Sequence, residues 1–434
     1  MMHIGCEGRS PVCVGRRALL AAIAIALAAV TGRVDAATDQ KFSEWGWPLP
    51  YEKVSQRSID WLKEKRWWPM RIAFSAPWSG QNAVNIVMDR EGLLQKRGLE
   101  AEWQAFTSGP AINEVVVSGR FQVGNAGNFP YASLVDKKVP IKTIAILSPN
   151  LFNALLVPNN STLQRLTDLR GQKSPAVVGL VTGSSAEFYL QMAASVNGIE
   201  IGKDVILKNL PTSEQLLFPG GLAAVAAWDP IPALIVGDKK NGRIIDDGFA
   251  YSIFQGSFYV RQDLIDNVPD VVQAISDAHA EAVLWIRQNP EKAVDWMLQD
   301  PNLKRFPRDI ILHQLKAYNT IYSPTYIYPH ADFWGAANEP IYRWLHEKGR
   351  LVRPLSVADF AATVDATFMA KTFDKLGWAI PKRPPFIPDT WAGNLSRPPY
   401  PKYVTPFSTE EPQVFPQPGD LTREWQFAGK TFRP

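Results

Sequence analysis

Short apolar runs alternate with helix patterns from residue 71 onward, and this alternation constrains the fold more than any other feature. Short runs between turn signals are typical of buried strands, whereas apolar residues at intervals of three and four are typical of helices. Strands separated by helices at this spacing predict a parallel sheet built from right-handed crossovers. The predicted strands are 71–74, 99–106 and 121–124, and the predicted helices are 83–97, closed by Gly98, and two that begin at Gly109 and Asn128.

The loops that follow these predicted strands are the first candidates for a binding site. In open sheets of this kind, ligands bind outside the carboxyl ends of the strands. Those ends correspond to residues 78–82, 107–109 and 125–128. We therefore expect a ligand to lie against these three loops.

The N-terminus has the segment order of a secretory signal. Arg16 and Arg17 precede an uncharged run over 18–30, and Val34-Asp35-Ala36 follows, with small residues where a signal peptidase reads them. A run of about 13 residues is too short to cross a hydrocarbon core of about 30 Å as a permanent helix. We predict a signal peptide over 1–36, removed on export. The adjacent arginines favour a twin-arginine signal, although two basic residues also suit the general secretory route.

Composition excludes several kinds of chemistry. The two cysteines, Cys6 and Cys13, precede the apolar run, so the mature chain is expected to have no disulfide, no Cys-ligated zinc and no Cys nucleophile. The formal charge of +4 includes arginines of the signal, so no nucleic-acid partner is expected. No cofactor and no metal site is predicted, because the later histidines lack metal-ligand spacing; they are His279, His313, His330 and His346.

Six segments, in the same order along the chain, resemble one family. They are 80–99, 108–110, 123–130, 166–173, 181–185 and 227–230, which includes Trp228-Asp229-Pro230. Together they resemble the nitrate/sulfonate/taurine-type solute-binding proteins of ABC importers, which also include binders of thiamine pyrimidine precursors. The resemblance covers roughly residues 70–300.

The resemblance implies an α/β fold of the periplasmic-binding-protein type II. In this fold, two lobes each hold a central, mostly parallel sheet flanked by helices, and the chain crosses between them twice, here near 148–154 and 251–257. It also implies a monomer in the periplasm that binds a small molecule by hinge closure and delivers it to a membrane permease and its ATPase. The expected parts are a signal peptide 1–36, an N-terminal arm 37–69, lobe 1 over 70–150, lobe 2 over 151–252, the return of lobe 1 over 253–380 and a proline-rich arm 381–434.

Both arms fall outside the resemblance. The N-terminal arm is rich in tryptophan, and the C-terminal arm combines many prolines with scattered aromatic residues. A flexible linker would lack these aromatic residues, so we predict extended arms that pack on the lobes.

The turn Gly183-Ser184-Ser185 precedes a predicted helix. Free backbone N–H groups and the helix dipole make such a turn a candidate anion site. The alternative is plain capping, because Ser184 and Glu187 have the spacing of a capping box. Glu187 departs from the family, in which many members have a neutral or basic residue at this position. A carboxylate there argues against a bare oxyanion such as nitrate or a simple sulfonate.

Trp228 and Asp229 end a predicted hydrophobic strand at a position that faces the cleft in the family. Trp228 offers a flat apolar surface, with core packing as the alternative, and Asp229 can accept hydrogen bonds, with helix capping before Pro230 as the alternative. With Tyr131 and Phe254 near the same loops, the pocket should be aromatic and suit an organic ligand. The predicted ligand-binding residues are Trp78, Ser79, Gly80, Gln81, Ser108, Asn128, Phe129, Gly183, Ser184, Ser185, Trp228 and Asp229.

Two other classes of protein share this fold. Desulfinases use a cysteine nucleophile, which the mature chain lacks, and no Ser-centred nucleophile elbow is present. We therefore expect no catalytic residues and no enzyme of the desulfinase or pyrimidine-biosynthesis kind. A ligand sensor that acts without a transporter is the other alternative.

Overall fold

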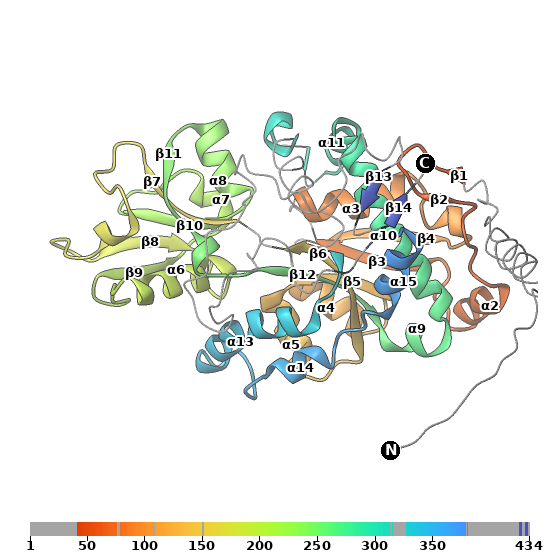
Figure 1. Cartoon of the computed structure of the whole chain (residues 1–434). Helices are drawn as coiled ribbons and strands as arrows, with labels where there is room; N and C mark the ends of the chain where they lie inside the picture. The colour runs from red at the N-terminus through yellow and green to blue at the C-terminus, as the bar shows by residue number, and fades with distance from the viewer. Residues whose placement is uncertain are drawn as a thin grey trace, which may run out of the picture. The chain divides into compact units, whose positions relative to one another are not determined.

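The computed structural model describes residues 41–75, 79–106, 109–149, 152–301, 303–304, 306–312, 315, 327–378, 380, 425–427 and 430–432 (Figure 1). The predicted signal peptide lies outside these residues. So does the predicted proline-rich arm, apart from two short antiparallel strands, β13 (Trp425–Phe427) and β14 (Lys430–Phe432).

A first five-stranded sheet defines what we call lobe 1. Its strand order is β4-β3-β5-β12-β6. Strand β3 pairs in parallel with β4 and β5, as the strand and helix alternation predicts, whereas β12 is antiparallel to both β5 and β6. The bounds are β3 (Met70–Ser75), β4 (Ala101–Phe106), β5 (Val123–Gly127), β6 (Ile141–Pro149) and β12 (Gln255–Arg261).

A second five-stranded sheet defines lobe 2, with the strand order β11-β7-β10-β8-β9. Here β10, β8 and β9 pair in parallel, and β7 runs antiparallel to β10 and β11. Each sheet thus has one strand that opposes the other four. The bounds are β7 (Asn153–Pro158), β8 (Ala176–Leu180), β9 (Val205–Asn209), β10 (Ala224–Trp228) and β11 (Gly242–Asp247).

The chain passes between the two sheets twice. It leaves lobe 1 after β6 and enters lobe 2 at β7, and it returns between β11 and β12. Strand β12 then inserts between β5 and β6 instead of adding to an edge. The lobe 1 sheet is therefore built from two separate stretches of sequence.

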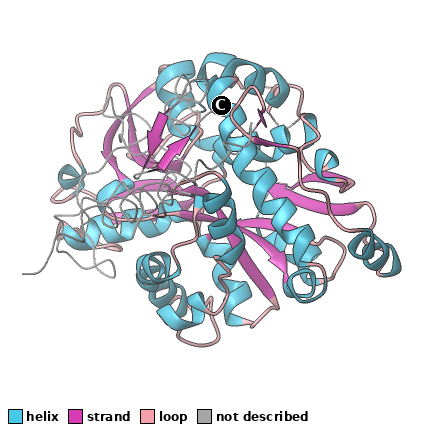
Figure 2. Ribbon diagram, turned by 45° about the vertical axis from the view of Figure 1, so that its right-hand side comes forward, coloured by secondary structure: helices cyan, strands magenta, loops and turns pink. Residues whose placement is uncertain are grey.

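Helices cover both sheets (Figure 2). Successive side chains of a strand point to opposite faces, so Ile72 belongs to the apolar cluster under α3 and α10, and Ala73 to the cluster under α4 and α5. The helices are α2 (Gln56–Glu64), α3 (Ser79–Arg90), α4 (Gly109–Val117), α5 (Asn128–Asp136), α6 (Ser185–Val196), α7 (Thr212–Gln215), α8 (Ile231–Ala233), α9 (Gln262–Asn267), α10 (Pro269–Gln288), α11 (Pro290–Met297), α13 (Ala331–Glu347), α14 (Val357–Ala361) and α15 (Thr367–Lys375). Short 3-10 turns lie at 95–97, 166–169 and 248–250, and a π-helix lies at 234–239.

The helix expected over 83–97 corresponds to α3, which starts before residue 83 and ends well before residue 97. Helix α3 ends at Arg90, because Gly92 has a positive φ of 60° that a helix cannot contain. A separate 3-10 turn then ends at Gly98, whose φ is 78°. Gly98 therefore closes this turn and not the long helix that the pattern predicted.

Residues 42–68 pack on lobe 1, where two of their side chains bond to one partner of a buried ion pair. Arg97 Nη2 lies 2.7 Å from Glu281 Oε2, and both side chains are at most 2% exposed. Trp45 Nε1 and Tyr51 Oη each donate a hydrogen bond of 2.8 Å to Glu281 Oε1. Burial, followed by the Glu281 carboxylate, raises the pKa of Tyr51. The N-terminal segment thus completes the hydrogen bonding of a buried charge.

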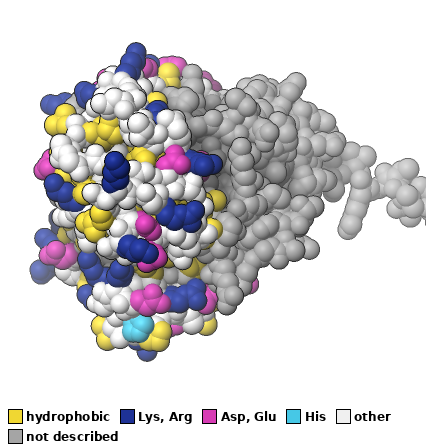
Figure 3. All heavy atoms as spheres, turned by 90° about the vertical axis from the view of Figure 1, so that its left-hand side faces the viewer, with side chains coloured by type: hydrophobic (Ala, Val, Ile, Leu, Met, Phe, Trp, Pro, Cys, Tyr) yellow, Lys and Arg dark blue, Asp and Glu magenta, His cyan; other side chains and the backbone are white. Residues whose placement is uncertain are grey.

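The same segment corrects the prediction of a wholly extended arm. Residues Gln56–Glu64 form helix α2, because the Ser55 hydroxyl accepts from the Ser58 amide and caps its first turn. The short strands β1 (Lys41–Phe42) and β2 (Pro48–Leu49) precede this helix. Among the described helices, none combines the length and apolar composition needed to cross a bilayer. On the face drawn in Figure 3, basic and acidic side chains of the described residues are interspersed.

Candidate functional site

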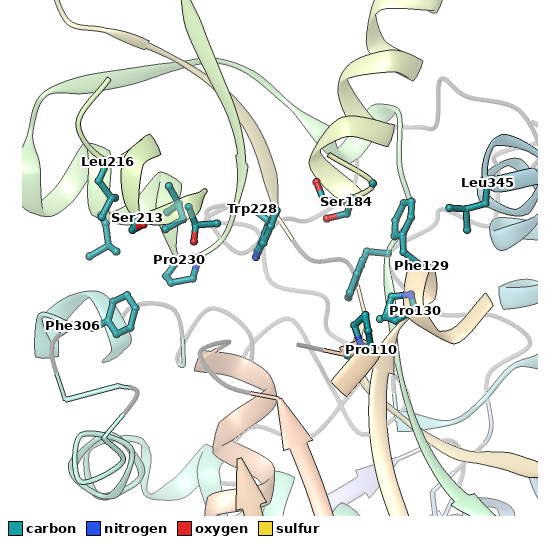
Figure 4. A pocket seen from close by; sticks show the side chains of 18 of the residues that line it. Pro110, Phe129, Pro130, Ser184, Ser213, Leu216, Trp228, Pro230, Phe306 and Leu345 are labelled. Atoms are coloured by element: carbon teal, nitrogen blue, oxygen red, sulfur yellow. The ribbon is translucent and has the colours of Figure 1, made fainter. Parts of the chain in front are cut away.

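A cavity of about 810 Å³ lies between the two lobes (Figure 4). From lobe 1, the first turns of α4 and α5 line it, and from lobe 2, the turn before α6 and the end of β10 line it. Part of its wall also comes from residues 306–307 and from the segment that follows α13. A volume of this size is in the range of small-molecule sites and far exceeds that of an inorganic ion.

Five of the predicted binding residues line this cavity. Phe129 extends from the first turn of α5, and Trp228 extends from the last position of β10. The other three form the turn before α6: Gly183, Ser184 and Ser185. The fold therefore brings the loops after β5, β8 and β10 to one place.

Asn128 and Asp229 are not among the residues that line the cavity, although their sequence neighbours are. Asn128 is fully buried, and its Nδ2 donates a hydrogen bond of 3.3 Å to the Ile253 carbonyl. The backbone amide of Asp229, also buried, donates to the Phe152 carbonyl at 2.9 Å. Ligand contact by either residue stays a prediction.

The remaining predicted residues belong to the loops after β3 and β4. Trp78 and Ser108 lie outside the described residues. Ser79, Gly80 and Gln81 form the first turn of α3, and nothing is described of their side chains. Their part in binding stays a prediction.

The turn before α6 is closed by its own side chains. Ser184 Oγ accepts a hydrogen bond from the Glu187 amide at 3.4 Å and donates one to the Val181 carbonyl at 2.6 Å. Glu187 Oε2 accepts from the Gly183 amide at 2.5 Å, and Ser185 Oγ donates to Asn153 Oδ1 at 3.1 Å. The capping alternative is therefore present in the structure. The Glu187 carboxylate occupies a donor that a bound anion would otherwise use.

The Glu187 carboxylate is also tied into a chain of hydrogen bonds between the lobes. Its Oε1 accepts from Gln191 Nε2 at 2.8 Å, and Gln191 Oε1 accepts from Trp344 Nε1 at 2.9 Å. Trp344 belongs to α13, which packs on lobe 1 through α5. Its ring also meets Phe129 and Phe188 edge to face, with centroids 6.0 and 5.6 Å apart. We call Phe129, Phe188, Gln191 and Trp344 the interlobe clasp.

The walls of the cavity are largely apolar. Trp228 is only partly buried: it packs against the lobe 2 core, as the core-packing alternative requires, and it also lines the cavity. Phe254 lines the cavity as expected, whereas Tyr131 does not, because its hydroxyl is buried with Thr143 and Thr363. Sequence reasoning missed further apolar lining residues, which are Leu216, Ile231, Leu234, Phe306, Leu345 and Leu351.

Three charged residues line the cavity, namely Asp238, Lys239 and Arg350, and the sequence analysis predicted none of them. Lys239 Nζ pairs with Asp238 Oδ2 at 3.0 Å. Arg350 comes from the turn after α13, where Gly349 has a φ of 67°. A glycine after a helix is a readable stop signal. No local sequence pattern indicates that this turn reaches the cavity between the lobes.

Asp246 lies at the end of β11, just before the chain returns to lobe 1. Burial raises the pKa of its carboxyl to about 7, although the Tyr189 hydroxyl donates to Oδ2 at 2.7 Å and opposes this rise. Among the described residues, no cluster of three or more His, Cys, Asp or Glu could hold a metal ion.

Comparison with known proteins agrees with this architecture. The taurine-binding periplasmic protein of Escherichia coli K12 is 23% identical over 286 residues, which cover 63% of this chain and 85% of that protein. Two crystal structures share the fold: the periplasmic aliphatic sulphonate binding protein of Escherichia coli (19% identity, TM-score 0.54, 67% of this chain and 90% of that one) and the periplasmic nitrate-binding protein of Synechocystis PCC 6803 (17% identity, TM-score 0.57, 73% and 91%).

These likenesses confirm the predicted α/β fold class and the resemblance to the nitrate/sulfonate/taurine type of binding protein. The NMT1-like family matches residues 68–297 in one continuous stretch. That stretch holds the turn before α6 and Trp228, and it covers more than half of the sequence. The chain belongs to the NMT1-like family.

Proposed function

We propose that this protein is the solute-binding component of an ABC importer and captures a small organic molecule between its two lobes. The observation that carries this proposal is the cavity of about 810 Å³, which both lobes line at the ends of their strands. A ligand there contacts both lobes at once and stabilises the closed state by hinge closure. A membrane permease and its ATPase then recognise the closed monomer.

The ligand has an apolar or aromatic body. Phe129, Trp228 and Phe254 line the cavity, and aromatic rings favour flat ligands through stacking and edge contacts. The Glu187 carboxylate already accepts from the Gly183 amide. A bare inorganic anion would meet this negative charge and leave most of the cavity unfilled.

The protein acts in the periplasm after removal of residues 1–36. The basic, apolar and small segments of the N-terminus support export. The periplasmic proteins for taurine, aliphatic sulphonate and nitrate that resemble this chain support the same location. Replacing Arg16 and Arg17 with lysine should block export if the twin-arginine route is used, and unchanged export would assign the general route.

The proposal assigns binding without catalysis. Both cysteines precede the predicted cleavage site, so a desulfinase-like nucleophile is missing from the mature sequence. A turnover assay with each stabilising compound tests this directly. Product formation at a rate that scales with protein concentration would overturn the assignment.

A thermal-shift panel on the mature protein tests the ligand class. Aromatic and heteroaromatic acids and pyrimidine-like compounds should stabilise it more than nitrate, sulfate or taurine do. A ligand at a hundredfold excess over its Kd adds about 2.7 kcal/mol of stability. Native mass spectrometry of protein from its own host should detect a bound small molecule. Stabilisation confined to nitrate or taurine would contradict the aromatic ligand.

A further inference from the structure

Arg350 reaches the cavity from the lobe opposite the turn before α6. It follows α13, which packs on α5 and α14, whereas Gly183 belongs to lobe 2. A methyl group placed on Gly183 would lie 3.2 Å from Arg350 Nη1 and 3.3 Å from Nη2. The guanidinium group therefore lies directly against the Gly183 backbone, at the edge of the cavity that it lines.

Arg350 differs from the other charged lining residues in its ion pairing. Lys239 and Asp238 neutralise each other at 3.0 Å. Within the part of the chain that the structure describes, Arg350 forms no ion pair, and its backbone amide bonds to the Leu345 carbonyl. The nearby Arg353, by contrast, pairs with Asp359 at 2.7 Å. The described lining thus carries one positive charge that forms no ion pair with a described carboxylate, although the Glu187 carboxylate lies at the same turn.

The backbone N–H next to the Arg350 guanidinium, that of Gly183, is already hydrogen-bonded. The Gly183 amide donates to Glu187, whose carboxylate also accepts from Gln191. An anionic group that enters the cavity beside this turn therefore finds the guanidinium in place of the Gly183 N–H. A guanidinium offers several donors in a planar fork that matches a carboxylate or sulfonate.

We propose that Arg350 is a specificity-determining residue that binds the anionic group of an otherwise apolar, aromatic ligand. This inference rests on the proposed function and deepens it. The ligand class is an organic anion: its flat body lies among Trp228, Phe129 and Phe254, and its charge lies beside Gly183. Because Arg350 comes from lobe 1, the anionic group also joins the two lobes.

Two fluorescent probes that differ by one sulfonate test this inference. They are 1-anilinonaphthalene-8-sulfonate and its neutral parent N-phenyl-1-naphthylamine, both of which brighten in apolar sites. Fluorescence titration of the mature wild-type protein should give saturable 1:1 binding of both. Arg350→Gln should weaken binding of the sulfonate by about tenfold or more, and should leave the Kd of the neutral probe within about twofold. Arg350→Lys should recover part of the loss.

Two control variants separate this role from other effects. Lys348 is exposed, lies two residues away and does not line the cavity, so Lys348→Gln should change neither Kd. Trp228→Ala should weaken both probes alike, which places them in the cavity. Equal Kd changes for the two probes in Arg350→Gln would overturn the role of Arg350 and leave the cavity intact. Failure of the wild type to bind either probe would overturn the proposed binding function itself.

Discussion

Replacing Asp246 with Asn should make the stability of this protein less dependent on pH. Asp246 is the penultimate residue of β11, before the chain passes back to lobe 1, and burial raises its pKa to about 7 from an ordinary value of 3.8. The unfolded chain therefore releases this proton at a lower pH than the folded protein does. Asn has no proton to release, and its amide oxygen still accepts from the Tyr189 hydroxyl.

The sign and size of the effect follow from the two pKa values. The folded state holds the proton longer, so the stabilising contribution is complete below about pH 4 and is lost as the pH rises to about 7. At about 1.4 kcal/mol for each pH unit, this loss is at most about 4 kcal/mol, and it stays constant above pH 7. The advantage of Asp246→Asn over the wild type should therefore grow from near zero to a few kcal/mol.

Urea unfolding at pH 4.5 and at pH 8 measures this difference. The exposed residue Asp309, which is distant from β11 in sequence, provides the control, because Asp309→Asn removes a charge at the surface and should change the free energy of unfolding by a similar small amount at both pH values. An equal free-energy difference between wild type and Asp246→Asn at pH 4.5 and pH 8 would refute the reasoning.

Four further predictions concern the cavity, the turn, the buried pair and the clasp. Trp228→Ala should weaken binding of an aromatic acid by roughly 1–3 kcal/mol in calorimetry, with most retained in Trp228→Phe; a loss of 3–5 kcal/mol in unliganded stability would instead make Trp228 a core residue. Ser184→Ala should lower the free energy of unfolding by about 1 kcal/mol at unchanged Kd, because its hydroxyl caps α6; a weaker Kd would assign the hydroxyl to the ligand. Glu281→Gln should destabilise by roughly 3–5 kcal/mol in urea, since Arg97 would stay buried without its counter-charge; a loss below about 1 kcal/mol would contradict this. Trp344→Phe removes the bond to Gln191 and should enlarge the unliganded protein in small-angle scattering; an unchanged curve would show that the clasp does not hold the lobes together.

Local patterns predicted most of the elements around the site. Helices α4 and α5 begin at Gly109 and Asn128 as predicted, and Ser184 caps α6, because each depends on residues close together in the chain. The end of α3 was missed, since a glycine inside a helix pattern is a stop signal only when its backbone adopts a positive φ, as Gly92 does.

The cavity was predicted only in part, for a physical reason. Phe129, Ser184 and Trp228 follow strands, and the rule that ligands bind at strand ends finds such residues. Arg350, Leu345 and Phe306 come from segments that the packing of later helices brings to the cleft. Their place depends on tertiary contacts such as that of α13 with α5, which have no periodic pattern in the sequence.

The insertion of β12 between β5 and β6 sets an order for folding during synthesis. All five strands of lobe 2 lie within residues 153–247, so that sheet can form as soon as this stretch is complete. The earlier strands of lobe 1 cannot complete their sheet until β12 has been synthesised. Trp45 and Tyr51 can bond to the Glu281 carboxylate only after Glu281 has been synthesised. Contacts this distant in sequence form slowly because they close a long loop. The lobe 1 strands that are synthesised first thus complete their sheet last. Until then, their apolar side chains are exposed and prone to aggregation.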